Sequence, residues 1–119
     1  MTKPFDLEPR TEAFARDVRA FIRVLPKTQC NLWDIKQLVR ASGSVGANFI
    51  EAREAVSQKD FLYRVRVSRK EAKEAGYWLR LLDTRGIPEL EESRLRLVAE
   101  CQELIRIMTA IIKKCELGD

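Results

Sequence analysis

The sequence predicts an all-α protein that folds as an antiparallel up-down-up-down four-helix bundle. Apolar and small residues recur every three or four positions along most of the chain, the spacing that keeps side chains on one face of a helix. Prolines, glycines and a capping motif divide this pattern into segments with short connections, and such connections favour antiparallel neighbours. No segment shows the alternation typical of a β-strand.

The length and composition indicate one domain that spans residues 1–119. A chain of this size buries about two-thirds of its unfolded surface, which is enough for a core without metal ions or disulfides. No apolar run approaches the roughly 20 residues that cross a bilayer, and the first residues lack the apolar region of a signal peptide. We therefore expect a cytoplasmic protein that makes no membrane contact.

The first helix is expected over residues 11–25, after a loosely held arm at residues 1–10. Pro26 ends this helix, because the residue before a proline is pushed out of the α-helical conformation. The apolar side chains that share its buried face are Phe14, Val18, Phe21 and Leu25.

The second helix is expected over residues 31–56, with Thr28 or Asn31 as its N-cap. Gly43 and Gly46 each cost about 1 kcal/mol relative to alanine inside a helix. We keep one helix through them because the apolar period continues on both sides, and the alternative is a loop that splits the helix there. The small residues around the glycines would let another helix approach closely. The expected core face is Leu38, Ser42, Val45, Phe49, Ala52 and Val56.

The third helix is expected over residues 58–85. Ser57 and Asp60 have the spacing of a capping box at its start, and Gly86 can adopt the left-handed conformation after its end. Its core face is Phe61, Val65, Ser68, Ala72, Ala75, Leu79 and Leu82.

The fourth helix is expected over residues 88–116, with Pro88 in its first turn. Only Arg94 interrupts its apolar face, which contains Leu90, Leu97, Cys101, Leu104, Met108, Ile111 and Cys115.

One exposed flank of the third helix is basic. Two interpretations of this flank stay open: a solvated face with ion pairs to Glu74 and its neighbours, or a surface that contacts phosphates while Tyr77 stacks on a base. The candidate nucleic-acid-binding residues are Lys59, Arg66, Lys70, Lys73, Tyr77 and Arg80.

The other exposed flank of the third helix carries more apolar surface than one bundle interior can use. A monomer rarely leaves such a line uncovered, so we expect a homo-oligomer. The candidate subunit-contact residues are Tyr63, Val67, Trp78 and Leu81.

The chain offers little for catalysis, and we expect neither an enzyme nor a bound metal or cofactor. It has no histidine, the commonest general base, so catalytic Ser-His and Cys-His pairs are excluded. A carboxylate-bridged di-iron site would need a Glu-x-x-His motif, which is missing. Cys30, Cys101 and Cys115 form no metal-binding spacing, and we interpret them as small core residues in a reducing compartment.

Three runs of residues carry a resemblance to a known family. They are Arg40-x-Ser42-x-Ser44-Val-Gly-Ala-Asn48-x-x-Glu51-Ala, Ser57-x-x-Asp60-Phe61, and Lys70-Glu-Ala-x-Glu74-x-x-Tyr77-Trp78-Leu79-x-Leu-Leu82. They resemble the bacterial 23S rRNA intervening-sequence proteins, and the motif residues are Ser42, Ser44, Asn48, Glu51, Asp60 and Phe61. Many members have Ala-Glu-Gly after the asparagine, where this chain has Ile50-Glu51-Ala52, so it looks like the subgroup with the Tyr-Trp-Leu ending.

The resemblance implies a four-helix bundle that assembles as a ring, a homopentamer, with no known catalytic activity. A related branch, the accessory variability determinants of diversity-generating retroelements, is a basic pentamer that binds nucleic acid and a reverse transcriptase. The resemblance supports Asn48 and Glu51 as motif residues, and we expect these two to make polar contacts between helices or with a neighbouring subunit. It identifies no basic residue as a contact.

Three hypotheses about function follow. The first is a non-catalytic, oligomeric bundle that binds RNA or DNA through its basic surface, as an accessory to a nucleic-acid enzyme. The second is an oligomeric module that binds a protein partner, with no role for nucleic acid. The third, with less support, is a bundle that binds a small ligand between helices near Gly43 and Gly46.

Overall fold

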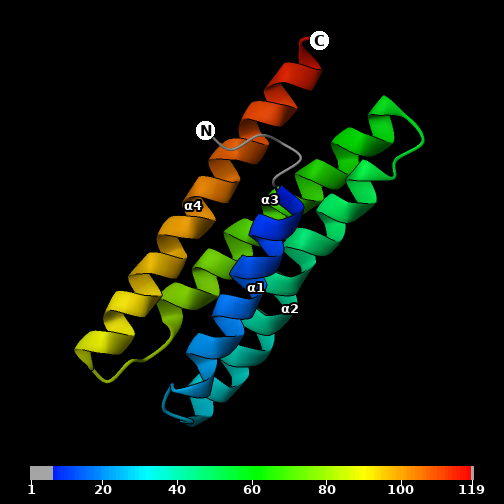
Figure 1. The fold of residues 1–119 in the computed structure, drawn as a ribbon. Helices are drawn as coiled ribbons and strands as arrows, with labels where there is room; N and C mark the ends of the chain where they lie inside the picture. The colour runs from blue at the N-terminus through cyan, green and yellow to red at the C-terminus, as the bar shows by residue number, and fades with distance from the viewer. Residues whose placement is uncertain (1–6, 119) are drawn as a thin grey trace.

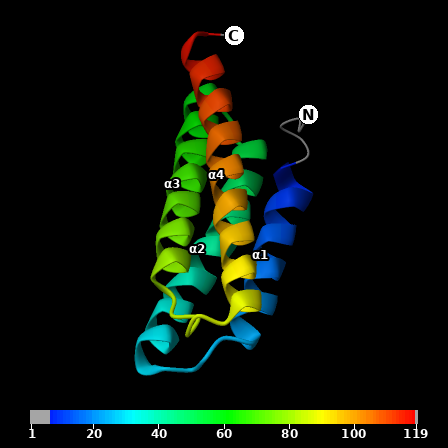
Figure 2. The same ribbon diagram turned by 90° about the vertical axis from the view of Figure 1, so that its left-hand side faces the viewer.

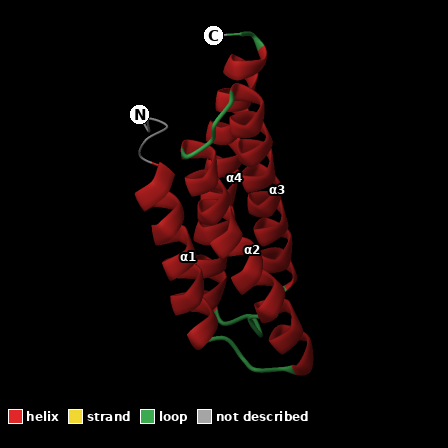
Figure 3. Cartoon of the chain, turned by 90° about the vertical axis from the view of Figure 1, so that its right-hand side faces the viewer, coloured by secondary structure: helices red, strands yellow, loops and turns green. Residues whose placement is uncertain are grey.

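The computed structural model describes residues 7–118. Figure 1 shows its four helices, α1 (Leu7–Arg23), α2 (Gln29–Arg53), α3 (Gln58–Leu81) and α4 (Pro88–Glu116). Each helix packs against the next along the chain and α4 also packs against α1, so α1 and α3 are diagonal to each other. Figure 3 shows only helices and connecting loops over the described residues. The predicted up-down-up-down four-helix bundle is confirmed.

The helix α1 begins earlier and ends earlier than the sequence predicts. Residues 7–10 are helical rather than part of an arm, because Leu7 is fully buried in the core. The rest of the predicted arm, residues 1–6, lies outside the described residues. The Nζ atom of Lys27 donates to the carbonyl oxygen of Ile22 in the last turn of α1 and to that of Leu25 just beyond the helix, at 2.7 Å each.

The helix α2 runs without interruption through both glycines, which confirms one helix rather than two. A Cβ atom at Gly46 would lie 2.9 Å from Oγ1 of Thr11, so the missing side chain allows α1 to approach α2 closely. Thr28 is the N-cap, and its side chain accepts a hydrogen bond from the backbone N–H of Asn31. The prediction that this helix reaches Val56 is wrong. Glu54 caps the helix, and Val56 is 94% exposed in the turn to α3.

The helix α3 begins as predicted, because the Ser57 side chain accepts a hydrogen bond from the Asp60 N–H at 3.1 Å. Its predicted end at Arg85 is wrong, since the helix stops at Leu81 and Leu82 is extended. Gly86 does adopt a left-handed conformation, with φ of 70°, but in the turn before α4 rather than directly after α3.

The helix α4 begins with Pro88 in its first turn, as predicted. Arg94, the one polar interruption of its buried face, pairs with Glu91 and donates a hydrogen bond to the carbonyl oxygen of Arg80 at 3.0 Å. The guanidinium therefore satisfies a carbonyl near the C-terminal end of α3.

The buried residues of all four helices form one core. The largest fully buried side chains are Phe14, Phe49, Leu7, Leu38, Leu79, Leu104 and Met108. Ile111 and Cys115, which were expected in the core, are only partly buried. Ile111 is turned about 100° around α4 from its neighbour Ile112, which is 3% exposed in the core. Cys115 lies in the last turn of α4, and Figure 2 shows that α4 extends beyond the start of the shorter α1.

Candidate nucleic-acid interface

The six residues of the predicted basic flank all lie exposed on α3. The neighbouring helices define this face from both sides: Glu71 points toward Arg40 of α2, and Arg69 donates to Oγ1 of Thr109 in α4 at 3.2 Å. Between these two seams lies a line that we call the basic stripe, which consists of Lys59, Arg66, Lys70, Lys73, Tyr77 and Arg80.

Most cations of the basic stripe have no acidic partner among residues 7–118. Arg66 pairs with Glu116 near the end of α4. Lys59, Lys70, Lys73 and Arg80 make no ion pair with any residue in the described part of the chain. The stripe therefore keeps a local excess of positive charge.

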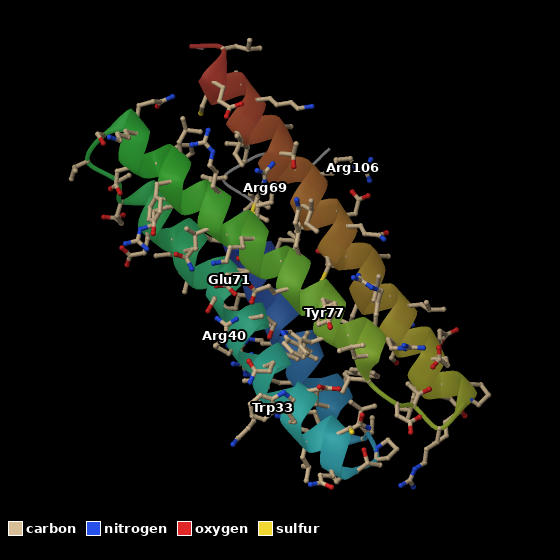
Figure 4. The ribbon with its side chains drawn as sticks, turned by 180° about the vertical axis from the view of Figure 1, so that it is seen from behind. Trp33, Arg40, Arg69, Glu71, Tyr77 and Arg106 are labelled. Atoms are coloured by element: carbon tan, nitrogen blue, oxygen red, sulfur yellow. The ribbon has the colours of Figure 1, made fainter. Side chains whose placement is uncertain are left out.

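The acidic side chains that could have neutralised the stripe are held by α2. Nη2 of Arg40 lies 2.8 Å from Oε1 of Glu74 and 3.2 Å from Oε1 of Glu71. Figure 4 shows Arg40 and Glu71 facing each other across the α2–α3 seam. Glu71 is only 8% exposed, and its hydrogen bond raises the pKa of Arg40 above the ordinary value. Ion pairing of Glu74 with the basic flank was one of the two open interpretations, and Glu74 instead pairs with Arg40 of α2.

The four residues of the predicted apolar flank do not form a continuous exposed surface. Tyr63 and Leu81 are about half exposed, at 57% and 48%, whereas Val67 is half-buried and Trp78 packs partly against the core. The carboxylates that bind Arg40 lie between Val67 and Trp78 on the same helix. The apolar surface is therefore divided into two short patches, and a subunit contact there stays a prediction.

Asn48, a family motif residue, joins α2 to α3. Its Nδ2 atom donates to the carbonyl oxygen of Ser44 at 2.9 Å, and its Oδ1 atom accepts from Nη1 of Arg64 at 3.2 Å. This is the expected polar contact between helices, made here within one chain. Glu51, by contrast, is exposed and makes no ion pair with the described residues.

The other motif residues shape the α2–α3 hairpin. Ser42 is fully buried, and its hydroxyl donates to the carbonyl oxygen of Val39 at 3.2 Å. The backbone N–H of Asp60 donates a hydrogen bond to Oγ of Ser57, the N-cap of α3, and Phe61 packs against the core. These positions stabilise the hairpin of α2 and α3.

Trp33, which was not among the residues predicted from the sequence, is 58% exposed on α2. Figure 4 shows it on the same face of the bundle as Tyr77, which is 49% exposed and contacts Trp78 edge-to-face with ring centroids 5.1 Å apart. A signal was present, since Trp33 shares one helical face with Lys36 and Arg40, three and seven residues later, away from the buried stripe.

A groove of about 560 Å³ lies between α1 and α4. Its lining includes the apolar side chains of Phe14, Phe21 and Leu97, and one end is closed by a double contact of Arg10 with Glu100, at 2.7 and 2.8 Å. A small ligand was expected near Gly43 and Gly46 instead. At Gly46, Thr11 of α1 packs directly against α2.

The cysteines do not form a site. Cys101 is buried, which raises the pKa of its thiol to about 12, but Cys115 is half-buried and Cys30 is exposed on α2. The expectation of a core position is therefore wrong for Cys30, which lies in the first turn of the helix. Within residues 7–118, no group of acidic or thiol side chains is arranged to hold a metal ion.

No helix in the described range combines the length and apolar character needed to cross a bilayer.

Known proteins similar to this chain agree with the fold. A crystal structure of a protein of unknown function from the S23 ribosomal protein family of Bacteroides thetaiotaomicron is 29% identical in sequence, with a TM-score of 0.81. The alignment covers 94% of this chain and 99% of that one. Among curated proteins, none matches the chain. The family model for the 23S rRNA-intervening sequence protein matches residues 7–110, so the chain belongs to this family.

Proposed function

We propose that this protein is a non-catalytic, oligomeric four-helix bundle that binds RNA or DNA through the basic stripe of α3. The observation that carries the proposal is a set of exposed cations that make no ion pair within the described residues, namely Lys59, Lys70, Lys73 and Arg80. Phosphate groups of a nucleic acid supply the missing negative charge, and neutralising them releases counterions. The absence of histidine from the sequence supports a binding role rather than a catalytic one.

The length of the stripe suits a polyanion. Lys59 and Arg80 are about 30 Å apart along the axis of α3, at 1.5 Å per residue. A small anion would need a cavity with converging donors, whereas a chain of phosphates can follow a straight line of cations. The free thiols of the chain favour the cytoplasm as the place of action.

The oligomeric state is part of the proposal. Half-exposed Tyr63 and Leu81 on α3 favour burial against another subunit. Five copies in a ring, as the resemblance to the family implies, would bring several stripes to one nucleic acid and raise the effective concentration of cations. Light scattering at micromolar concentration tests this part, and a monomeric mass would contradict it.

Binding is tested by fluorescence anisotropy with labelled RNA and DNA over a series of salt concentrations. In the variant with Lys70→Glu and Lys73→Glu, we expect the affinity to fall. The negative slope of log affinity against log salt should become less steep by about two. The matched control is the double variant Arg16→Glu with Arg23→Glu. It changes the net charge by the same amount, but on α1, which is diagonal to α3. Equal affinity and slope in the wild type and the Lys70/Lys73 variant would exclude the stripe.

The alternative function is an oligomeric module for a protein partner. The two exposed apolar patches at Tyr63 and Leu81 favour it. In that case nucleic acid would bind weakly and the two charge-reversed variants would behave alike. The same titration therefore separates the two functions.

A further inference from the structure

We infer that the face of the bundle formed by the exposed sides of α2 and α3 binds single-stranded nucleic acid more tightly than duplex, with the rings of Trp33 and Tyr77 stacking on unpaired bases. This inference rests on the proposed function, and it adds a residue of α2 and a class of nucleic acid to it.

Trp33 and Tyr77 share one face only in the folded bundle. Arg40 contacts Glu74 across the seam, so the two positions mark one level of the bundle. Trp33 precedes Arg40 by seven residues, about 10 Å along the axis, and Tyr77 follows Glu74 by three residues, about 5 Å. Because the helices are antiparallel, both steps lead toward the same end of the bundle. Figure 4 shows the two side chains on one face at that end.

The rings of Trp33 and Tyr77 are both exposed to solvent. Trp33 is 58% exposed and Tyr77 is 49% exposed, although an aromatic ring gains most from burial. The edge of one ring against the other holds Tyr77 beside Trp78, at 5.1 Å between centroids. Trp78 packs against the core, so Tyr77 has a supported orientation.

Exposed cations share the helix faces of both rings, and the two acids in this stretch of α3 are bound to Arg40. Lys70, Lys73 and Arg80 share the face with Tyr77, and Lys36 is exposed beside Trp33 on α2. None of these four pairs with an acid in the part of the chain that the structure describes. Glu71 and Glu74, the acids of this stretch of α3, are bound to Arg40. A polyanion with flat apolar groups is the complementary partner.

Single strands fit this combination better than duplexes. Phosphate contacts are available in both, but a base in a duplex is already stacked on its neighbours and presents no free ring face. An unpaired base can stack on an exposed aromatic side chain while the cations follow the backbone. The exposed rings therefore add affinity only for a single strand.

The test compares two labelled probes at one salt concentration, an oligothymidylate of about 20 nucleotides and a duplex of the same length. We expect Trp33→Ala and Tyr77→Ala to weaken binding of the single strand roughly five- to hundredfold each. The salt slope and the affinity for the duplex should stay as in the wild type. Leu32→Ala is the matched control, because Leu32 is 50% exposed next to Trp33 but points about 100° away around the helix.

A direct readout comes from Trp78→Phe, in which Trp33 is the one remaining tryptophan of the two in the sequence. Its fluorescence should be quenched by the single strand and not by the duplex. Trp33→Phe should keep part of the single-strand affinity, since it keeps a ring.

Different outcomes separate this inference from the proposed function. If the Trp33 and Tyr77 variants bind the single strand as Leu32→Ala does, while reversal of Lys70 and Lys73 still weakens binding, the inference fails and the proposed function stands. If reversal of the lysines affects neither probe, the proposed function fails. A smaller oligomer for Trp33→Ala in light scattering would show that Trp33 is a subunit contact, which also overturns the inference.

Discussion

Asn31 and Asp83 are joined by two hydrogen bonds that run in opposite directions. The Nδ2 atom of Asn31 donates to the carbonyl oxygen of Asp83, and the backbone N–H of Asp83 donates to Oδ1 of Asn31, each at 2.9 Å. Nδ2 also donates to the carbonyl oxygen of Pro26 at 2.9 Å. One side chain in the first turn of α2 therefore ties together both loops at this end of the bundle.

Replacing Asn31 with alanine should destabilise the protein by about 2–3 kcal/mol, because the loop backbone loses its partners and Asn31 is only 1% exposed. Urea unfolding followed by circular dichroism measures this loss. Cys30→Ala, next to it and exposed, is the control and should change the free energy of unfolding by less than about 0.5 kcal/mol. Equal stabilities of the two variants would show that the loop contacts contribute little.

The two glycines of α2 should respond to alanine with opposite signs. Gly43→Ala should stabilise the protein by up to about 1 kcal/mol, since the nearest atom to the new Cβ is a side-chain nitrogen of Arg19 at 3.6 Å, an ordinary contact distance. Gly46→Ala should destabilise it by about 1–3 kcal/mol, because the new Cβ would meet Thr11 at 2.9 Å. Thermal unfolding of the pair provides the comparison. A gain in stability for both would mean that α1 can shift away without cost.

Removing Arg40 should destabilise the α2–α3 seam. In Arg40→Ala, Glu71 keeps its buried position without a cation, so the free energy of unfolding should fall by about 1–3 kcal/mol. The loss stays in this range because Arg40 is half exposed and water screens its charge. The double variant with Glu71→Gln should recover part of this loss, since it removes the unpaired charge. A double-mutant cycle by urea unfolding measures the coupling, and a coupling near zero would contradict the role of the ion pair.

Glu91 should contribute stability that depends on pH. Hydrogen bonds from Arg94 and then from Thr84 lower the pKa of its carboxyl below the ordinary value of 4.5. A lowered pKa in the folded state means that the contribution is complete above 4.5 and is lost as the pH falls through the folded value. The melting temperature of Glu91→Gln should therefore lie below that of the wild type at neutral pH. The difference should shrink in acid, and a constant difference from pH 7 downward would speak against this linkage.

The three thiols should react with a thiol reagent in an order set by burial. Cys30 is exposed and should react first, whereas Cys101 is buried with a pKa raised to about 12 and should react only when the protein unfolds. Labelling at mild alkaline pH followed by mass spectrometry of peptides gives the order. Cys30→Ala should abolish the fast phase. Rapid labelling of Cys101 in the folded protein would indicate that the α3–α4 seam opens.

The positions of the helices could be predicted because the signals for them are local. Apolar spacing, Ser57 with its cap on Asp60, and Pro88 in the first turn of α4 act within a few residues, so the sequence shows them directly. The fold class and most of the core followed from the same spacing. The basic stripe was also found in this way, since all its members lie on one helix.

The helix ends and the surroundings of the stripe depended on the tertiary structure. The helix α3 stops before Asp83, whose backbone is bound by Asn31, a residue 52 positions away. Arg40 of α2 takes both carboxylates that the sequence would assign to the lysines of α3, and Trp33 of α2 joins the face of Tyr77. The sequence by itself determined which residues form helices and which side of each helix is apolar, because these depend on neighbours along one chain segment. Only the packing of antiparallel helices decided which charges remain unpaired and which rings share a surface, because those partners come from different segments.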